Sequence, residues 1–231
     1  MNARSARTTP RPRAQARSAT PSPRAAARTS TLRSTLPAPT PLPKREAILK
    51  AALRVFAEYG VHGVPVPEIA AQAGVGTGTI YRFFASKEVL INELFREQKR
   101  AINRRLTEDL DRSLEPRALF QEYWRRLVAF AREEPEAFRF LELQDHLPYL
   151  DDESLALERS VLAPLANASR KLQRQGVYRK DIRIEVFMAL HWGAFVNLFK
   201  AERAGYFKIR SVDIEAACEA CWRMCAATPS R

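Results

Sequence analysis

Four side chains of types that bind nucleic acids lie within six positions of one another: Thr77, Thr79, Tyr81 and Arg82. Two hydroxyls, a phenol and a guanidinium form hydrogen bonds with phosphates and with base edges in a major groove. None of these groups, at this spacing, makes a nucleophile or an acid–base pair. The chemistry that this group of side chains could do is recognition of DNA.

Two short helices joined by a turn would position these side chains. The first has an apolar stripe made of Val66, Ile69, Ala70 and Ala73. Gly74 permits the left-handed turn that follows, and the second helix spans roughly residues 77–84 with Ile80 and Phe84 turned inward. Small alanines on the first helix allow the second to cross closely, while Val75 and Ile80 fill the shared core. The pattern is typical of a helix-turn-helix.

Longer helices flank this pair on both sides. The preceding one starts at Lys44 and carries an apolar stripe made of Ile48, Ala51, Ala52, Val55, Phe56 and Tyr59. Gly60 is expected to end it as a left-handed residue. After the pair, Ser86 is a candidate N-cap for a long helix that begins at Lys87 and runs to about Leu114.

The remaining sequence has helical periodicity and no strand pattern. Prolines and Gly176 divide it into helices expected near 116–133, 136–145, 152–175, 182–204 and 212–227. The segment 182–204 is apolar on most of its faces, so it must be covered on more than one side. The sequence therefore predicts an all-α fold with about nine helices.

Residues 45–95 resemble the DNA-binding domain of TetR-family transcriptional regulators. The resemblance is carried by Gly74-Val75-x-x-Gly78-Thr79-Ile80-Tyr81-x-x-Phe84-x-Ser86-Lys87-x-x-Leu90. It implies a three-helix DNA-binding domain over residues 44–92 and a helical domain for ligand binding and dimerisation over residues 93–227. Residues 1–43 form a tail before both.

The resemblance also implies roles for individual residues. Thr77, Gly78 and Thr79 match positions that contact base edges, and Tyr81 and Lys87 match positions that bind the phosphate backbone. Lys87 is placed at a helix N-terminus, whose dipole also favours an anion.

Some positions leave alternatives open or depart from the family pattern. Arg82 could bind a guanine with both of its guanidinium nitrogens, or it could contact a phosphate. The stretch Val64-Pro65-Val66-Pro67 lacks the hydroxyl that family members usually have there, and Gly76-Thr77-Gly78 replaces a more polar start of the recognition helix. These differences leave the operator sequence open without changing the expected binding mode.

The charge of the chain is concentrated at its N-terminus. The 231 residues contain 38 Lys and Arg and 26 Asp and Glu, a net charge of +12, and residues 1–43 hold eight arginines, eight prolines and no acidic residue. Such a segment is expected to be disordered, either as a solvated leader or as a basic arm attracted to phosphate. No apolar run is long enough to span a membrane and no secretory signal is present, so we expect a soluble, cytoplasmic protein without a membrane partner.

The resemblance implies a helical regulatory domain that binds a small effector and dimerises through its last two long helices, 182–204 and 212–227. Candidate pocket residues are Trp124, Phe138, Leu141, His146, Tyr149, Trp192 and Phe195, because effector pockets are mostly apolar with a few polar groups. Each of them could equally be a core residue. The sequence does not identify the effector.

Cys218, Cys221 and Cys225 share one face of the last helix. They could bind a soft metal or sense oxidants, but without a fourth ligand nearby, packing as small hydrophobic residues is favoured. Three histidines lie far apart in sequence, and no phosphate-binding glycine loop or nucleophile motif is present. We therefore predict no metal, no cofactor and no catalytic residues.

Together these observations predict a homodimeric regulator of TetR type. It would act as a repressor that binds double-stranded DNA at a palindromic operator and is released by a small-molecule effector. The alternative is an architectural protein that binds any DNA sequence through the basic tail.

Overall fold

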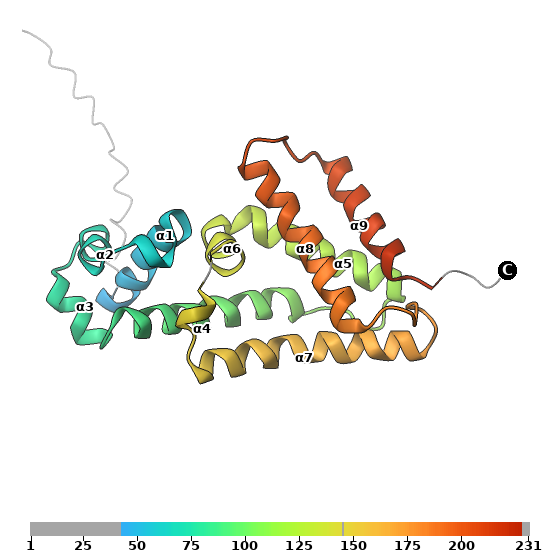
Figure 1. Cartoon of the computed structure of the whole chain (residues 1–231), viewed down its shortest axis with the longest axis horizontal. Helices are drawn as coiled ribbons and strands as arrows, with labels where there is room; N and C mark the ends of the chain where they lie inside the picture. Colours follow the sequence, from blue (N-terminus) through green and yellow to red (C-terminus); the bar gives the residue numbers. More distant parts are fainter. Residues whose placement is uncertain (1–42, 145, 228–231) are drawn as a thin grey trace, which may run out of the picture. The chain divides into compact units, whose positions relative to one another are not determined.

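A computed structural model describes residues 43–144 and 146–227. These residues form nine α-helices, one short 3-10 helix (η1) and no strand. The elements are α1 (Lys44–Gly63), α2 (Val66–Ala73), α3 (Thr77–Phe83), α4 (Lys87–Thr107), α5 (Pro116–Glu133), α6 (Pro135–Glu142), η1 (Leu147–Tyr149), α7 (Asp152–Arg174), α8 (Ile184–Arg203) and α9 (Ser211–Cys225) (Figure 1). The predicted all-α architecture is confirmed. The expected tail of residues 1–43 lies almost entirely outside the described residues.

Local capping explains where several helices begin. The Ser86 hydroxyl accepts a hydrogen bond of 3.3 Å from the main-chain N–H of Val89, which fixes the start of α4 as predicted. Asp151 caps α7 in the same way, accepting from the N–H of Ser154 at 2.8 Å. Pro116 and Pro135 are the first residues of α5 and α6, where the missing N–H of proline has no cost.

The end of α1 differs from the expectation. Helical structure resumes after Gly60 and continues to Gly63, with a break at Gly60 (φ 78°, ψ 162°). Tyr59 was expected in the buried stripe, but its side chain is 68% exposed, so that expectation is wrong. The break redirects the chain, and Val61 and Val64 enter the core after it instead.

The long helix α4 ends at Thr107 rather than near Leu114 as expected. Asp109 has a positive φ of 52°, which a helix cannot accommodate. The guanidinium of Arg126, on α5, donates to the main-chain oxygens of Glu108 and Asp109 at 2.5 and 3.1 Å and holds this turn. A contact from a distant helix therefore determines where α4 ends.

One continuous core joins the two halves of the chain. Phe56 on α1 stacks on Phe140 of α6 at 6.2 Å between ring centroids, and both rings are completely buried. Helix α4 packs against α1 as well as against α5, α6 and α7, so it belongs to both halves. Helices α8 and α9 lie side by side at the end of the chain (Figure 1). The core therefore connects the helix-turn-helix mechanically to the helices that follow it.

Candidate DNA-binding surface and regulatory core

The turn between α2 and α3 has the geometry of a helix-turn-helix. Gly74 adopts the left-handed conformation (φ 66°, ψ 32°), and the N–H of Val75 donates to the carbonyl of Ala70 at 3.0 Å. A side chain at Gly74 would be strained in this conformation. The glycine thus closes α2 and directs the chain into α3.

Helix α3 presents one buried and one exposed face. Ile80 is 1% exposed and Phe84, which directly follows the helix, is completely buried, so these two residues anchor α3 to the core. Gly78, Tyr81 and Arg82 are exposed on the opposite side. Thr77 and Thr79 are half-buried. The exposed residues form a polar surface held by two apolar anchors, which is the arrangement that insertion into a major groove needs.

Gly78 lies within α3 although glycine is unfavourable in a helix. A Cβ atom added there would meet no protein atom within 4 Å. Packing within the chain therefore does not explain the glycine. The bare backbone at this position leaves room for a close approach by a molecule outside the chain.

Lys87 is the first residue of α4 and lies beside the recognition helix. Its ammonium is 5.9 Å from the centroid of the Phe56 ring, and partial burial lowers its pKa from the ordinary value. The aromatic contact restrains the side chain at the N-terminus of α4, where a phosphate would also be favoured.

Phe83, the last residue of α3, is also exposed, with 43% of its side chain accessible. Sequence reasoning did not select it, because an aromatic residue next to Phe84 is more typical of the core. The spacing of the two buried residues could have predicted its exposure. Ile80 and Phe84 are four residues apart on one face of the helix, which leaves Phe83 at the edge of that face.

Five of the seven predicted pocket residues lie together among the helices that follow α4, residues 116–225, called the regulatory half below because of the role expected for it. Trp124, Phe138 and Trp192 each lie 5.4–5.9 Å from the Phe195 ring, measured between centroids, and Leu141 is buried in the same core. These rings pack directly against one another. In the structure described here they fill the space between α5, α6 and α8.

The other two predicted pocket residues lie elsewhere. The His146 ring is 5.1 Å from that of Phe95 and 5.6 Å from that of Phe140. The hydroxyl of Tyr149 is 2.8 Å from Nδ1 of His62 in α1. Both residues therefore lie where the segment between α6 and α7 meets the first half of the chain.

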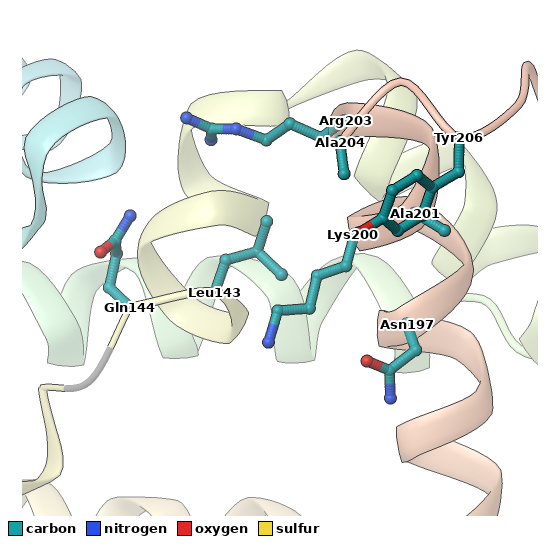
Figure 2. Close-up of a pocket in the computed structure, with 8 residues that line it drawn as sticks. All are labelled: Leu143, Gln144, Asn197, Lys200, Ala201, Arg203, Ala204 and Tyr206. Carbon is teal, nitrogen blue, oxygen red and sulfur yellow. The ribbon is translucent and has the colours of Figure 1, made fainter.

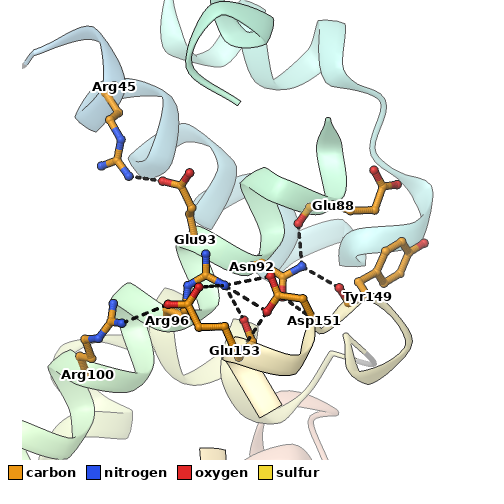
Figure 3. A network of polar contacts seen from close by, with 10 residues as sticks. Arg45, Glu88, Asn92, Glu93, Arg96, Arg100, Tyr149, Asp151 and Glu153 are labelled. Carbon is orange, nitrogen blue, oxygen red and sulfur yellow. Dashed lines mark hydrogen bonds and ion pairs between the residues drawn. The ribbon is translucent and has the colours of Figure 1, made fainter. Parts of the chain in front are cut away.

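That segment is fixed by a polar network around Asn92 of α4 (Figure 3). The Asn92 side chain is buried; its Nδ2 donates to the carbonyls of Glu88 and Tyr149, and its Oδ1 accepts from the N–H of Asp151. Arg96, one turn later, donates to the Asp151 carboxylate at 3.0 Å. This network could not be predicted from the sequence, because Tyr149 and Asp151 lie 57 and 59 residues from Asn92.

A charged cluster between α4 and the regulatory half was also not expected from the sequence. Lys99 Nζ lies 2.9 Å from Oε2 of Glu158 and 3.8 Å from Oε1 of Glu142, and Trp192 Nε1 donates to Glu142 at 2.9 Å. Burial raises the pKa of Glu142, and the nearby ammonium of Lys99 opposes that shift. The cluster ties α4, α6, α7 and α8 together.

The three cysteines of α9 are buried and unpaired by disulfides. Burial raises the pKa of the Cys218 thiol to about 11 and that of the Cys225 thiol to about 12. Thiols of such high pKa are poor nucleophiles and poor metal ligands at neutral pH. Among the described residues, no group of three side chains is arranged to hold a metal ion, and no helix could span a membrane.

The sequence matches two family models that meet within α4. Residues 48–94 match the model of bacterial regulatory proteins of the tetR family, and residues 95–227 match that of the tetracyclin repressor-like C-terminal domain. The second match alone covers more than half of the chain.

Similar proteins agree with this assignment. A fatty acid metabolism regulator protein of Bacillus subtilis is 44% identical over 68 residues, which are 29% of this chain and 35% of that protein. A probable acrEF/envCD operon repressor of Escherichia coli K12 is 27% identical over 177 residues, 71% of this chain and 80% of that protein. A crystal structure of a TetR family transcription regulator from Marinobacter aquaeolei VT8 is 25% identical, with a TM-score of 0.71 over 80% of this chain and 96% of that one.

The relatives are regulators rather than enzymes, and no match favours a protein that binds DNA without sequence preference. The chain covers only about a third of the length of the Bacillus relative. Both family models together span the helix-turn-helix and all the helices that follow it. The chain belongs to the TetR family of bacterial regulatory proteins.

Proposed function

We propose that this protein is a homodimeric repressor that binds a palindromic operator through α3. The observation that carries the proposal is the exposed face of α3, where Gly78, Tyr81 and Arg82 project beside Lys87 from a helix anchored by Ile80. Two copies of α3, one from each protomer, would enter successive major grooves. A protein that binds chromosomal DNA would be located at the nucleoid, in the cytoplasm.

Residue roles follow from exposure and chemistry. Thr77, Gly78 and Thr79 contact base edges, while Tyr81 and Lys87 bind phosphates. Arg82 is fully available for either contact: a guanine read through O6 and N7, or a phosphate. In this division of the chain, residues 44–92 bind DNA and residues 93–227 regulate that binding.

The faces of α8 and α9 support the proposed homodimer. Val186 and Leu190 on α8 and Val212 on α9 are 39%, 48% and 58% exposed. Ala194 and Ala216, which are also exposed, continue these two faces with small side chains. Apolar helix faces of this kind are covered when two copies form a four-helix interface.

An effector bound in the regulatory half would control DNA binding by favouring one of two conformers of the dimer. The conformer with the effector would separate the two α3 helices by a distance that no longer matches the operator. Only a difference in effector affinity between the two conformers is needed. The seven residues named as pocket candidates remain a prediction.

Selection of bound duplexes from a random DNA pool tests the proposal. The full chain should enrich a palindrome, and Tyr81→Ala and Lys87→Ala should each weaken binding to it about tenfold or more, because each removes a phosphate contact. Tyr59→Ala is the matched control, since Tyr59 is also an exposed tyrosine of the same half but lies outside α3. Equal binding by all four proteins would refute the assignment of α3.

The same duplexes decide between regulator and architectural protein. A chain lacking residues 1–43 should keep its preference for the palindrome and lose only affinity and salt dependence. Loss of the preference together with the tail would favour the architectural alternative. Arg82→Ala adds one distinction: a changed base preference assigns Arg82 to a base, and an unchanged preference assigns it to a phosphate.

A further inference from the structure

A cavity of about 650 Å³, open to solvent along one side, lies between the end of α6 and the last turns of α8 (Figure 2). Its polar lining consists of two cations, Lys200 and Arg203, the amides of Gln144 and Asn197, and the phenol of Tyr206. Leucine and alanine side chains supply the apolar part of the wall. Among the described residues that line it, none is acidic. None of the seven predicted pocket residues lines this cavity.

The two cations are not neutralised in the same way. Within the described part of the chain, the ammonium of Lys200 has no ion-pair partner and no hydrogen-bond acceptor. Arg203 forms one ion pair, with Glu58 of α1 at 3.6 Å. Figure 2 shows both side chains extending from α8 toward the side on which Gln144 lies. The ammonium of Lys200 and the guanidinium of Arg203 end on opposite sides of Leu143 (Figure 2), so an anion that contacts both draws the Arg203 side chain away from Glu58. Cations beside an apolar wall suit an anionic group attached to an apolar body.

We propose that this cavity binds a small amphipathic anion, such as a carboxylate or a phosphate ester carried on an apolar chain or ring. Lys200 and Arg203 bind the anionic group, and the apolar wall near Leu143 and Ala201 covers the rest of the molecule. The proposal deepens the function proposed above, because it assigns the chemical class of the effector and rests on the regulatory role of this half.

The cavity is connected directly to the DNA-binding half. Glu58 of α1 is held by Arg203 of α8 at 3.6 Å and by Arg139 of α6 at 3.5 Å. Gln144, in the cavity wall, donates to the carbonyl of Ala57 at 3.2 Å. Ion pairs as exposed as that of Glu58 are weak. An anion in the cavity therefore competes successfully for Arg203, and α1 loses one of its attachments to the regulatory half.

Isothermal titration calorimetry of the full chain with three ligands of equal chain length tests the binding site. Decanoate should bind, whereas decanol and decyltrimethylammonium, all at submicellar concentration, should bind at least tenfold more weakly. Lys200→Gln should weaken decanoate binding about ten- to a hundredfold, because it removes one charged hydrogen-bond donor. Lys171→Gln, an exposed lysine on α7, should bind decanoate like the unaltered protein.

Two results of this titration would overturn the proposal: equal binding of decanoate and decanol, or unchanged decanoate binding by Lys200→Gln. A further variant, Ala201→Trp, fills the cavity and should abolish decanoate binding while the protein remains dimeric in light scattering. If Ala201→Trp dissociates the dimer instead, a second copy of the chain occupies the cavity and the ligand assignment is wrong.

Operator binding measured on the same proteins tests the link to α1. Decanoate should weaken operator binding by the unaltered protein, and Glu58→Gln should still bind decanoate but lose this effect. Decanoate binding that leaves operator affinity of the unaltered protein unchanged would contradict the link. If the protein binds no operator in the absence of ligand, the proposed function is refuted. If it binds the operator but does not bind decanoate, only this inference is refuted.

Discussion

The buried amide of Asn92 donates a hydrogen bond of 2.7 Å to the main-chain oxygen of Tyr149. Asn92 belongs to the helix that leads out of the DNA-binding half, and Tyr149 belongs to the segment that leads into α7. The same amide accepts from the N–H of Asp151 at 2.9 Å. One side chain thus satisfies two main-chain groups of a loop 57 and 59 residues away, and it connects the two halves of the molecule.

Asn92→Ala is expected to lower the free energy of unfolding by about 1–2 kcal/mol, because part-buried main-chain groups of Tyr149 and Asp151 lose their partners. Asn197→Ala is the control, since its exposed amide donates only to the carbonyl of Gly193 in its own helix. Urea denaturation of the two variants measures the difference. Equal unfolding free energies would mean that water replaces the Asn92 amide.

Gly78→Ala separates stability from DNA binding. Because a Cβ at this position meets no protein atom, alanine should raise the free energy of unfolding by about 0.5–1 kcal/mol through its better helix propensity. The added methyl group should also weaken operator binding, since it occupies the space reserved for the DNA. Denaturation and fluorescence anisotropy on the same sample check both effects. A variant that gains stability and keeps its operator affinity would show that α3 does not approach DNA at Gly78.

The helices could be predicted from the sequence to within a few residues, since apolar spacing and proline positions are local signals. The range 116–133 was predicted and is the observed α5. The end of α4 could not be predicted, because Arg126 from another helix holds the turn there. Tyr59 fits the apolar period of α1 and is nevertheless exposed, because the break at Gly60 changes the direction of the chain.

The two candidate sites differ in whether their residues are neighbours in the sequence. The α3 surface is contained in one short helix, so its exposed residues follow from the positions of Ile80 and Phe84. The cavity near Lys200 depends on how the end of α6 packs beside α8, and no spacing in the sequence encodes that contact. Aromatic residues such as Trp124 and Phe195 suggested a pocket, but the same chemistry makes them pack against each other.

His191 is expected to make stability depend on pH. Burial among the rings of Phe120, Trp124 and Phe187 lowers its pKa to about 4. The unfolded chain, with an ordinary histidine pKa near 6.5, binds more protons than the folded chain between those two values, so stability falls as the pH drops from about 6.5 to about 4. This loss is on the order of 3 kcal/mol at most.

The His191→Phe variant tests this dependence, because phenylalanine fits the aromatic surroundings and does not titrate. Unfolding free energies at pH 7 and pH 4.5 should differ less in the variant than in the unaltered protein, by about 2 kcal/mol. Carboxylates that lose ion pairs at low pH contribute equally to both proteins and cancel in the comparison. Identical pH dependence of the two proteins would show that folding does not lower the pKa of His191.

The cysteines of α9 should not react with thiol reagents in the native protein. Burial raises the pKa values of Cys218 and Cys225 to about 11 and 12 and that of Cys221 in the same direction, so little thiolate exists at pH 7. Mass spectrometry after brief maleimide treatment should find no label on native protein and three labels after denaturation. Rapid labelling of any one thiol in the native state would restore the hypothesis of an oxidant sensor.

The most direct test of the central claim is the ratio of two dissociation constants, measured by fluorescence anisotropy at physiological salt. One is for the palindrome selected by the full chain, and the other is for a duplex of the same composition in scrambled order. A regulator that reads DNA through α3 should prefer the palindrome by about a thousandfold or more, and Tyr81→Ala should bind both duplexes more weakly. A ratio close to one, unchanged by Tyr81→Ala, would contradict sequence-specific recognition by this helix.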